Sequence, residues 1–159
     1  MSRTEHAVSP TYTMDIFTAG ADVLVNPVNC VGVAGCGLAL QFRQRYPKHH
    51  DAYFAACQAG DVQLGRSLLS VDPSRLVVHF PTKLHWRDRS HLADIAAGLD
   101  TLAEQLVGLG GRVIALPALG CGAGGLWWSE VHPLLQRFAS RGIIPSVIIC
   151  PPLTDKEDA

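Results

Sequence analysis

The stretch VNPVNCVGVAGCGLALQF, residues 25–42, joins a short apolar run to a segment with helical spacing. A nearly continuous apolar run of this length is typical of a buried strand in a parallel sheet, so a strand is expected over residues 23–27. The loop that follows contains four small residues: Gly32, Ala34, Gly35 and Gly37. A connection that only reverses the chain needs fewer small residues than this, so the loop is a candidate binding element.

The rest of the chain repeats this alternation of strand and helix. The remaining expected elements are a helix over residues 38–59 broken at Pro47, strands at 66–71 and 75–80, a helix from Ser90 to Leu109, a strand at 112–117, a helix from Ser129 to about residue 140, and a strand at 146–150. Proline is tolerated only in the first turn of a helix, which sets the break at Pro47. Ser90 and Ser129 are expected N-caps, and Gly110 and Gly111 are expected to stop the long helix.

Strands and helices that alternate with short connections predict the α/β class. We expect three layers, α/β/α, with a mixed, mostly parallel central sheet covered on both faces. One domain is expected over residues 11–152, with a loose N-terminus at 1–10 and a loose tail at 153–159. Ligands of such sheets bind in the crevice beyond the carboxyl ends of the strands, and the unusual loops of this chain follow strands.

Composition excludes several classes of protein. Hydrophobic residues make up 48% of the 159 residues and charged residues 17%, as in a compact globule rather than a disordered chain. The net charge of −1 gives no global field for nucleic acid or a membrane surface, so such a partner needs a local patch. Five cysteines without a CxxC pair argue against a zinc site or a disulfide framework. We expect a cytoplasmic protein with no signal peptide, no membrane association and a monomeric state.

A second glycine-rich stretch, LPALGCGAGGLWW at residues 116–128, also connects a strand to a helix. It contains four glycines, Gly120, Gly122, Gly124 and Gly125. Bare backbone N–H groups at a helix N-terminus bind anions, so two such loops at one edge of a sheet could hold a diphosphate from opposite sides. The first loop matches neither a P-loop nor GxGxxG, and a tight packed turn is its alternative. For the second loop the alternative is a flexible surface loop.

The third unusual segment, FPTKLHWRDRS at residues 80–90, surrounds an aromatic ring with cations. Lys83, His85, Arg87 and Arg89 flank Trp86. A solvated charge cluster is one interpretation. The other is a surface for single-stranded nucleic acid, which is held by backbone charge and base stacking.

In this order and spacing, VNPVNCVGVAGCGLALQF, FPTKLHW and LPALGCGAGGL resemble the macrodomain family of ADP-ribose-binding modules. The resemblance runs from Asp15 to about Pro152. It is strongest for the branch that contains the DarG antitoxin and the human terminal ADP-ribose protein glycohydrolase. It implies ADP-ribose as ligand or product, with no cofactor and no metal.

The resemblance also implies roles for individual residues. Asp15 would bind the adenine amino group, Asn29 would hold the distal ribose during catalysis, and Lys83 would be the lysine on which hydrolysis depends. Asn26 is expected to be structural, tying together the backbone of the first loop. The other implied ligand-binding positions are Ile16, Gly35, Cys36, Gly37, Leu38, Pro81, Thr82, Gly120, Cys121, Gly122, Ala123, Gly124, Gly125 and Leu126.

Two positions depart from the family pattern. The human glycohydrolase has an aspartate in its second glycine loop where this chain has Gly124, and the family has a glycine where this chain has Met14. Lys83 could stabilise the leaving group as an ammonium, or attack C1″ of the distal ribose as a free amine. Without an aspartate to resolve such an adduct, the electrostatic role is favoured.

The predicted function is a hydrolase that removes mono-ADP-ribose from a modified macromolecule. DNA base adducts are the first expectation, and glutamate or aspartate esters on protein are the second. Two alternatives remain open, a non-catalytic ADP-ribose reader and a hydrolase of small ADP-ribose derivatives.

Overall fold

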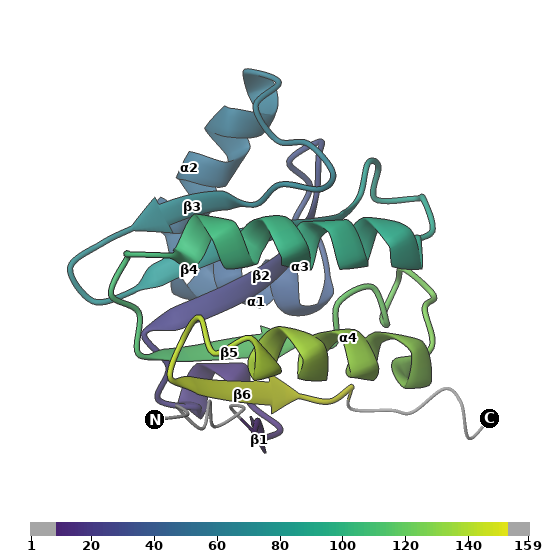
Figure 1. Cartoon of the computed structure of the whole chain (residues 1–159). Helices are drawn as coiled ribbons and strands as arrows, with labels where there is room; N and C mark the ends of the chain where they lie inside the picture. Colours follow the sequence, from purple (N-terminus) through teal and green to yellow (C-terminus); the bar gives the residue numbers. More distant parts are fainter. Residues whose placement is uncertain (1–8, 153–159) are drawn as a thin grey trace, which may run out of the picture.

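The apolar runs form one six-stranded sheet in the computed structural model, which describes residues 9–152 (Figure 1). The strands are β1 (Thr11–Tyr12), β2 (Val23–Asn29), β3 (Leu68–Val71), β4 (Leu76–Lys83), β5 (Val113–Pro117) and β6 (Ser146–Cys150). Their order across the sheet is β1-β6-β5-β2-β4-β3. Only β3 runs antiparallel to its neighbour among these strands, which confirms the mixed, mostly parallel sheet.

Helices cover both faces of this sheet. They are α1 (Gly37–Arg45), α2 (Pro47–Gln58), α3 (Leu92–Leu106) and α4 (Trp128–Ser140), with a short 3-10 helix η1 (Ile16–Thr18). Alternate residues of β2 face opposite layers, since Val23 and Val25 pack with α3 and α4 whereas Leu24 packs with Phe42 of α1. The predicted α/β/α layering is confirmed (Figure 1). Within residues 9–152, none of the helices has the length and apolarity that a membrane span requires.

The predicted break at Pro47 is confirmed, but both predicted N-caps are wrong. Pro47 occupies the first turn of α2. The N-cap of α3 is His91 and that of α4 is Trp127, one or two residues away from the predicted serines, and neither side chain makes a capping hydrogen bond. Ser90 is instead buried, and its backbone N–H donates to the Gly124 carbonyl.

The long helix also ends earlier than predicted. Val107 leaves the helical conformation with ψ at 126°, and Gly108 follows with φ at +78°. Leu109 therefore lies outside α3 and is 52% exposed. The leucine spacing continued past the end of the helix and did not reveal that Gly108 stops it first.

A glycine within α3 lets this helix approach the sheet closely. A Cβ at Gly98 would lie 2.5 Å from the ring of Phe80 in β4, which is closer than real contacts allow. Glycine inside a helix costs about 1 kcal/mol relative to alanine. The close packing of α3 on β4 offsets this cost, and it fixes the helix that follows the Lys83 segment.

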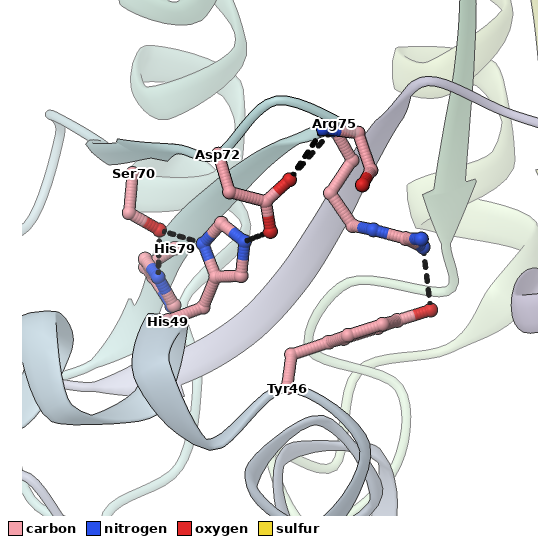
Figure 2. Close-up of polar contacts among 7 residues, drawn as sticks. Tyr46, His49, Ser70, Asp72, Arg75 and His79 are labelled. Carbon is pink, nitrogen blue, oxygen red and sulfur yellow. Dashed lines mark hydrogen bonds and ion pairs between the residues drawn. The ribbon is translucent and has the colours of Figure 1, made fainter.

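A chain of buried and half-buried polar groups lies between the sheet and α2 (Figure 2). The nitrogen of Asn26 lies 3.3 Å from Nδ1 of His79, and Nε2 of His79 lies 2.9 Å from the Ser70 hydroxyl. That hydroxyl lies 2.6 Å from Nδ1 of His49, whose Nε2 is 2.7 Å from the Asp72 carboxylate. An amide nitrogen only donates and a carboxylate only accepts. Each group therefore donates to the next one in the order Asn26, His79, Ser70, His49 and Asp72.

This chain of donors requires an uncharged His79. Burial lowers the pKa of His79 to about 3, with smaller effects of His49 and His50. The hydrogen bond from His49 lowers the pKa of Asp72. Between pH 3 and pH 6.5 the unfolded chain therefore takes up a proton at His79 that the folded chain excludes.

We expect the folded protein to lose stability as the pH falls through this window. For His79 alone, the loss from pH 7.5 to pH 5.5 is about 1.4 kcal/mol. Urea denaturation at the two pH values measures it. His79→Gln retains a donor toward Ser70 but cannot titrate, so this variant should lose less stability between the two pH values. An equal loss in wild type and variant would show that His79 is not the group responsible.

Candidate functional site

The parallel strands bring their carboxyl ends to one rim of the sheet. Asp15 follows β1, residues 118–127 follow β5, residues 30–36 follow β2, and Lys83 ends β4. Since β5 and β2 lie between β6 and β4, the rim carries Asp15, the second glycine loop (118–127), the first glycine loop (30–36) and Lys83 in that order. The four strand spacings from β1 to β4 amount to roughly 19 Å.

Asn29 and Lys83, the two predicted catalytic residues, are neighbours. They are paired across β2 and β4, directly after a register shift between Val28 and Asn29. The half-buried Lys83 directs its amine to the carbonyl of Trp86, 2.9 Å away. The sequence did not reveal this pairing, because the register between two strands about 50 residues apart depends on tertiary packing.

The side chain of Asn29 organises the first glycine loop. Its oxygen accepts hydrogen bonds from the backbone N–H groups of Val31, Gly32 and Val33, at 3.1–3.3 Å. Its nitrogen donates to the Val33 carbonyl at 2.8 Å. The expectation that Asn26 ties this loop together was wrong, because the Asn26 side chain hydrogen-bonds His79 of β4 and not the loop backbone.

Tyr53 of α2 supports Asn29, and sequence reasoning missed it. Its hydroxyl lies 2.7 Å from the Asn29 carbonyl and 3.0 Å from the side-chain oxygen of the same residue. The ring stacks on His79 with an interplanar angle of 14° and is fully buried. Burial raises the pKa of this hydroxyl, with further contributions from Cys57 and Cys30, so Tyr53 remains a donor. The residue pattern of α2 did not indicate the face on which Tyr53 lies.

The first glycine loop presents bare backbone to solvent. Gly35, Cys36 and Gly37 are exposed, and a Cβ at Gly37 would meet nothing within 4 Å. Gly37 has φ at +60° and begins α1, whose first N–H groups have no intrahelical acceptor. A Cβ at Gly32 would lie 3.1 Å from the ring of Phe54, so α2 supports the loop from behind.

The second glycine loop is closed by its own backbone. Leu126 donates to the carbonyl of Gly120 at 2.9 Å, and Gly120 and Gly125 have φ at +76° and +78°. The tip of the loop, Gly122 and Ala123, is exposed, with nothing within 4 Å of a Cβ at Gly122. Both glycine loops therefore expose backbone at the rim, as a diphosphate site requires.

Gly124 has no space for a side chain. A Cβ there would lie 2.3 Å from the Ser90 hydroxyl and 2.6 Å from the Gly120 carbonyl. The Ser90 hydroxyl is buried and has no hydrogen-bond partner among the described residues. Ser90 therefore occupies the space that an aspartate at position 124 would need.

Asp15 lies at the far end of the rim from Lys83. Its carboxylate is exposed and caps η1 by accepting from Phe17 N–H at 2.9 Å. Burial raises the pKa of Cys150, the last residue of β6, to about 11, and the negative charge of Asp15 adds to the effect. The carboxylate therefore lies near the carboxyl end of β6, where an adenine could be bound.

Several predicted ligand-binding residues have buried side chains. Ile16 packs into the core beside α1, and Pro81 and Thr82 are buried in β4, with the Thr82 hydroxyl 3.3 Å from the Val28 carbonyl. Cys121 is buried as well, and its thiol contacts the Leu119 carbonyl. Contacts from these positions to a ligand would therefore come mainly from the backbone.

Residues 84–90, which follow β4 and which we call the basic segment, form a turn around Trp86. Its indole is 44% exposed, and the guanidinium of Arg87 lies 4.5 Å from the ring centroid. The Asp88 carboxylate accepts from the backbone of His85, which closes the turn. Arg89 turns away and lies against Gly125 of the second glycine loop. The predicted cations therefore divide between two surfaces.

Comparison with known proteins agrees with this arrangement. The Macro domain family matches residues 25–135 of the chain. The DNA ADP-ribosyl glycohydrolase of Mycobacterium tuberculosis is 42% identical over 142 residues, which make up 86% of this chain and 40% of that protein. A protein of the same name from Thermus aquaticus is 42% identical over 127 residues, 77% of this chain and 35% of that protein.

Solved structures match over most of the chain. The macrodomain of Mycobacterium tuberculosis DarG superposes with a TM-score of 0.83 and 39% identity, covering 90% of this chain and 99% of that one. Thermosipho africanus DarTG in complex with ADP-ribose gives a TM-score of 0.82 and 32% identity, covering 92% of this chain and 43% of that one. The chain therefore belongs to the Macro domain family.

Proposed function

We propose that this protein hydrolyses the bond between ADP-ribose and a modified DNA base. The observation that carries the proposal is the order of groups along the rim, which follows the order of ADP-ribose from adenine through diphosphate to distal ribose and ends at Lys83. Relatives named DNA ADP-ribosyl glycohydrolase support DNA as the substrate. The chain spans 40% of the length of one relative and 35% of the other.

In the proposed reaction the bond from C1″ to the base nitrogen breaks and a water oxygen bonds to C1″. The water gives up one proton, and the departing base nitrogen takes up one. The two glycine loops hold the diphosphate, while the second N–H of the Asn29 amide donates to a ribose hydroxyl. Positioning of this kind supplies a large part of the rate. The Lys83 ammonium stabilises the negative charge that develops on the leaving base.

The space around Gly124 favours this electrostatic role over a covalent one. A lysine adduct at C1″ needs a group that activates water to release it. The nearest candidate position in the second glycine loop is filled by Ser90. We therefore assign Lys83 to charge stabilisation.

One observation favours a second substrate class. The ADP-ribose 1″-phosphate phosphatase of Candida albicans is 27% identical over 139 residues, which cover 78% of this chain and 89% of that protein. A small phosphorylated ADP-ribose derivative would use the same glycine loops. Such a substrate leaves the surface beyond Lys83 unused.

Replacing Lys83 separates an enzyme from a reader module. Lys83→Ala should lower release of ADP-ribose from a modified oligonucleotide by on the order of 100-fold or more, because one transition-state charge partner is lost. Its affinity for ADP-ribose, measured by calorimetry, should change little. Lys48→Ala removes an exposed lysine of α2 and serves as the control.

The substrates in this assay should include a glutamate-modified protein and ADP-ribose 1″-phosphate. Faster turnover of either one than of the modified oligonucleotide would contradict a DNA base as the substrate. If wild type and Lys83→Ala release equally little ADP-ribose from all three, the protein is a reader.

Tyr53→Phe should weaken ADP-ribose binding without removing any group that touches the ligand. The variant loses the hydroxyl that donates to Asn29, and a lost hydrogen bond of this kind costs about 1 kcal/mol, or about fivefold in affinity. Tyr46→Phe removes the hydroxyl that accepts from Arg75 and is the matched control. Calorimetry on both variants tests the prediction, and equal affinities would show that Tyr53 does not position Asn29.

Gly124→Asp tests the assignment of Lys83. We expect this variant to lose about 1–3 kcal/mol of stability through overpacking against Ser90, and to gain no turnover. Urea denaturation measures this loss. Gly122→Asp, which has open space around its Cβ, is the control and should be as stable as wild type. A stable Gly124→Asp protein with faster turnover would instead indicate a covalent intermediate.

A further inference from the structure

Exposed apolar side chains gather around Lys83, at the end of the rim away from Asp15. They are Val31 of the first glycine loop (46% exposed), Phe54 of α2 (43%), and Leu84 and Trp86 of the basic segment (55% and 44%). We call these four residues the outer surface. The sheet order places β4 and the edge strand β3 on this side of the rim.

Backbone contacts join the parts of the outer surface. Cys30 N–H donates to the Leu84 carbonyl at 2.9 Å, which holds the first glycine loop against the basic segment. On its other side the same loop packs on Phe54, whose ring would lie 3.1 Å from a Cβ at Gly32. The outer surface is therefore built on fixed backbone.

A guanidinium lies over one exposed ring, and an imidazole lies against each of the two. Arg87 covers Trp86 at 4.5 Å, and His85 lies beside the same indole with ring centroids 5.3 Å apart. His50 stacks on Phe54 with an interplanar angle of 28°.

Charges of both signs surround His50 and the Trp86 turn. Burial and then nearby Arg43 lower the pKa of His50, while Asp51 acts in the opposite direction. The other acidic group, Asp88, is engaged by the backbone of His85. Arg43 and Arg87 are exposed, so both remain accessible to a negatively charged partner.

The position of the outer surface relative to Lys83 identifies what could bind there. The Lys83 amine donates a hydrogen bond to the backbone carbonyl of Trp86. The indole therefore belongs to the residue that positions the proposed catalytic amine. ADP-ribose would occupy the rim from Asp15 to Lys83. The leaving group, and whatever is covalently attached to it, must then continue past Lys83 toward Trp86 and Leu84.

We propose that the outer surface binds the single strand of DNA that flanks the modified base. This inference rests on the proposed function and adds the path of the strand. Exposed aromatic rings beside exposed arginines match a single strand, because bases stack on aromatic rings and arginine pairs with phosphates. The net charge of −1 supplies no general attraction to DNA, so a local surface must hold the strand.

The test compares a long and a short substrate. The long substrate is a 20-nucleotide single strand with one ADP-ribosylated base, and the short one is the ADP-ribosylated mononucleoside. Wild type should have a higher kcat/KM for the long substrate. Trp86→Ala, which keeps the carbonyl that Lys83 uses, should raise KM for the long substrate by on the order of tenfold. Leu84→Ala, which keeps the carbonyl that accepts from Cys30, should raise it by a smaller factor. Neither should change turnover of the mononucleoside more than twofold.

Matched controls come from the opposite end of the sheet. Leu109→Ala removes an equally exposed apolar side chain, and Arg112→Ala an exposed arginine, both before β5. Neither should alter the length preference. Arg87→Ala should reduce the slope of log KM against log salt concentration for the long substrate by about 0.7, as expected for one lost phosphate contact.

Failure of this inference differs from failure of the proposed function. If wild type cleaves both DNA substrates but the outer-surface variants keep the full length preference, the strand lies elsewhere and the enzyme assignment stands. If Trp86→Ala impairs only a glutamate-modified peptide, the surface binds protein and the DNA path is wrong. If wild type cleaves neither DNA substrate, both the function and the path are wrong.

Discussion

The hydrogen bonds made by the Asn29 side chain are the constraint on which the candidate site depends. One amide oxygen accepts from the backbone of Val31, Gly32 and Val33, so the loop after β2 is held in one shape before any ligand arrives. Those three N–H groups are no longer available to a ligand. The loop therefore divides its backbone into a part that fixes its own shape and an exposed part, residues 35–37, that remains free to bind an anion.

Residues of α2 and of the sheet interior hold Asn29 in place. Tyr53 holds Asn29 and stacks on His79, and His79 is one member of the polar chain that ends at Asp72. The hydrogen bonds of this chain join β2, β3, β4 and α2, so the chain favours a single arrangement of these elements. The relative positions of Asn29 and Lys83 follow from that arrangement.

Sequence reasoning predicted the features that depend on neighbouring residues. Apolar runs gave the strands from β2 onward, Pro47 gave the division between α1 and α2, and glycine spacing gave both rim loops. Features that depend on distant residues were not predicted. The pairing of Asn29 with Lys83 and the buried position of Tyr53 belong to this group. Ser90 was misassigned because its neighbours favour a cap, whereas its backbone bonds Gly124 of the second glycine loop.

The contact of Gly98 with Phe80 limits how this protein can be made more robust. Replacing helical glycines with alanine is a common route to higher melting temperature, because it reduces the freedom of the unfolded chain. At position 98 the added methyl group would push α3 off the sheet, and the segment that carries Trp86 leads directly into that helix. A substitution chosen at this position only for its helix propensity would therefore disturb the catalytic geometry.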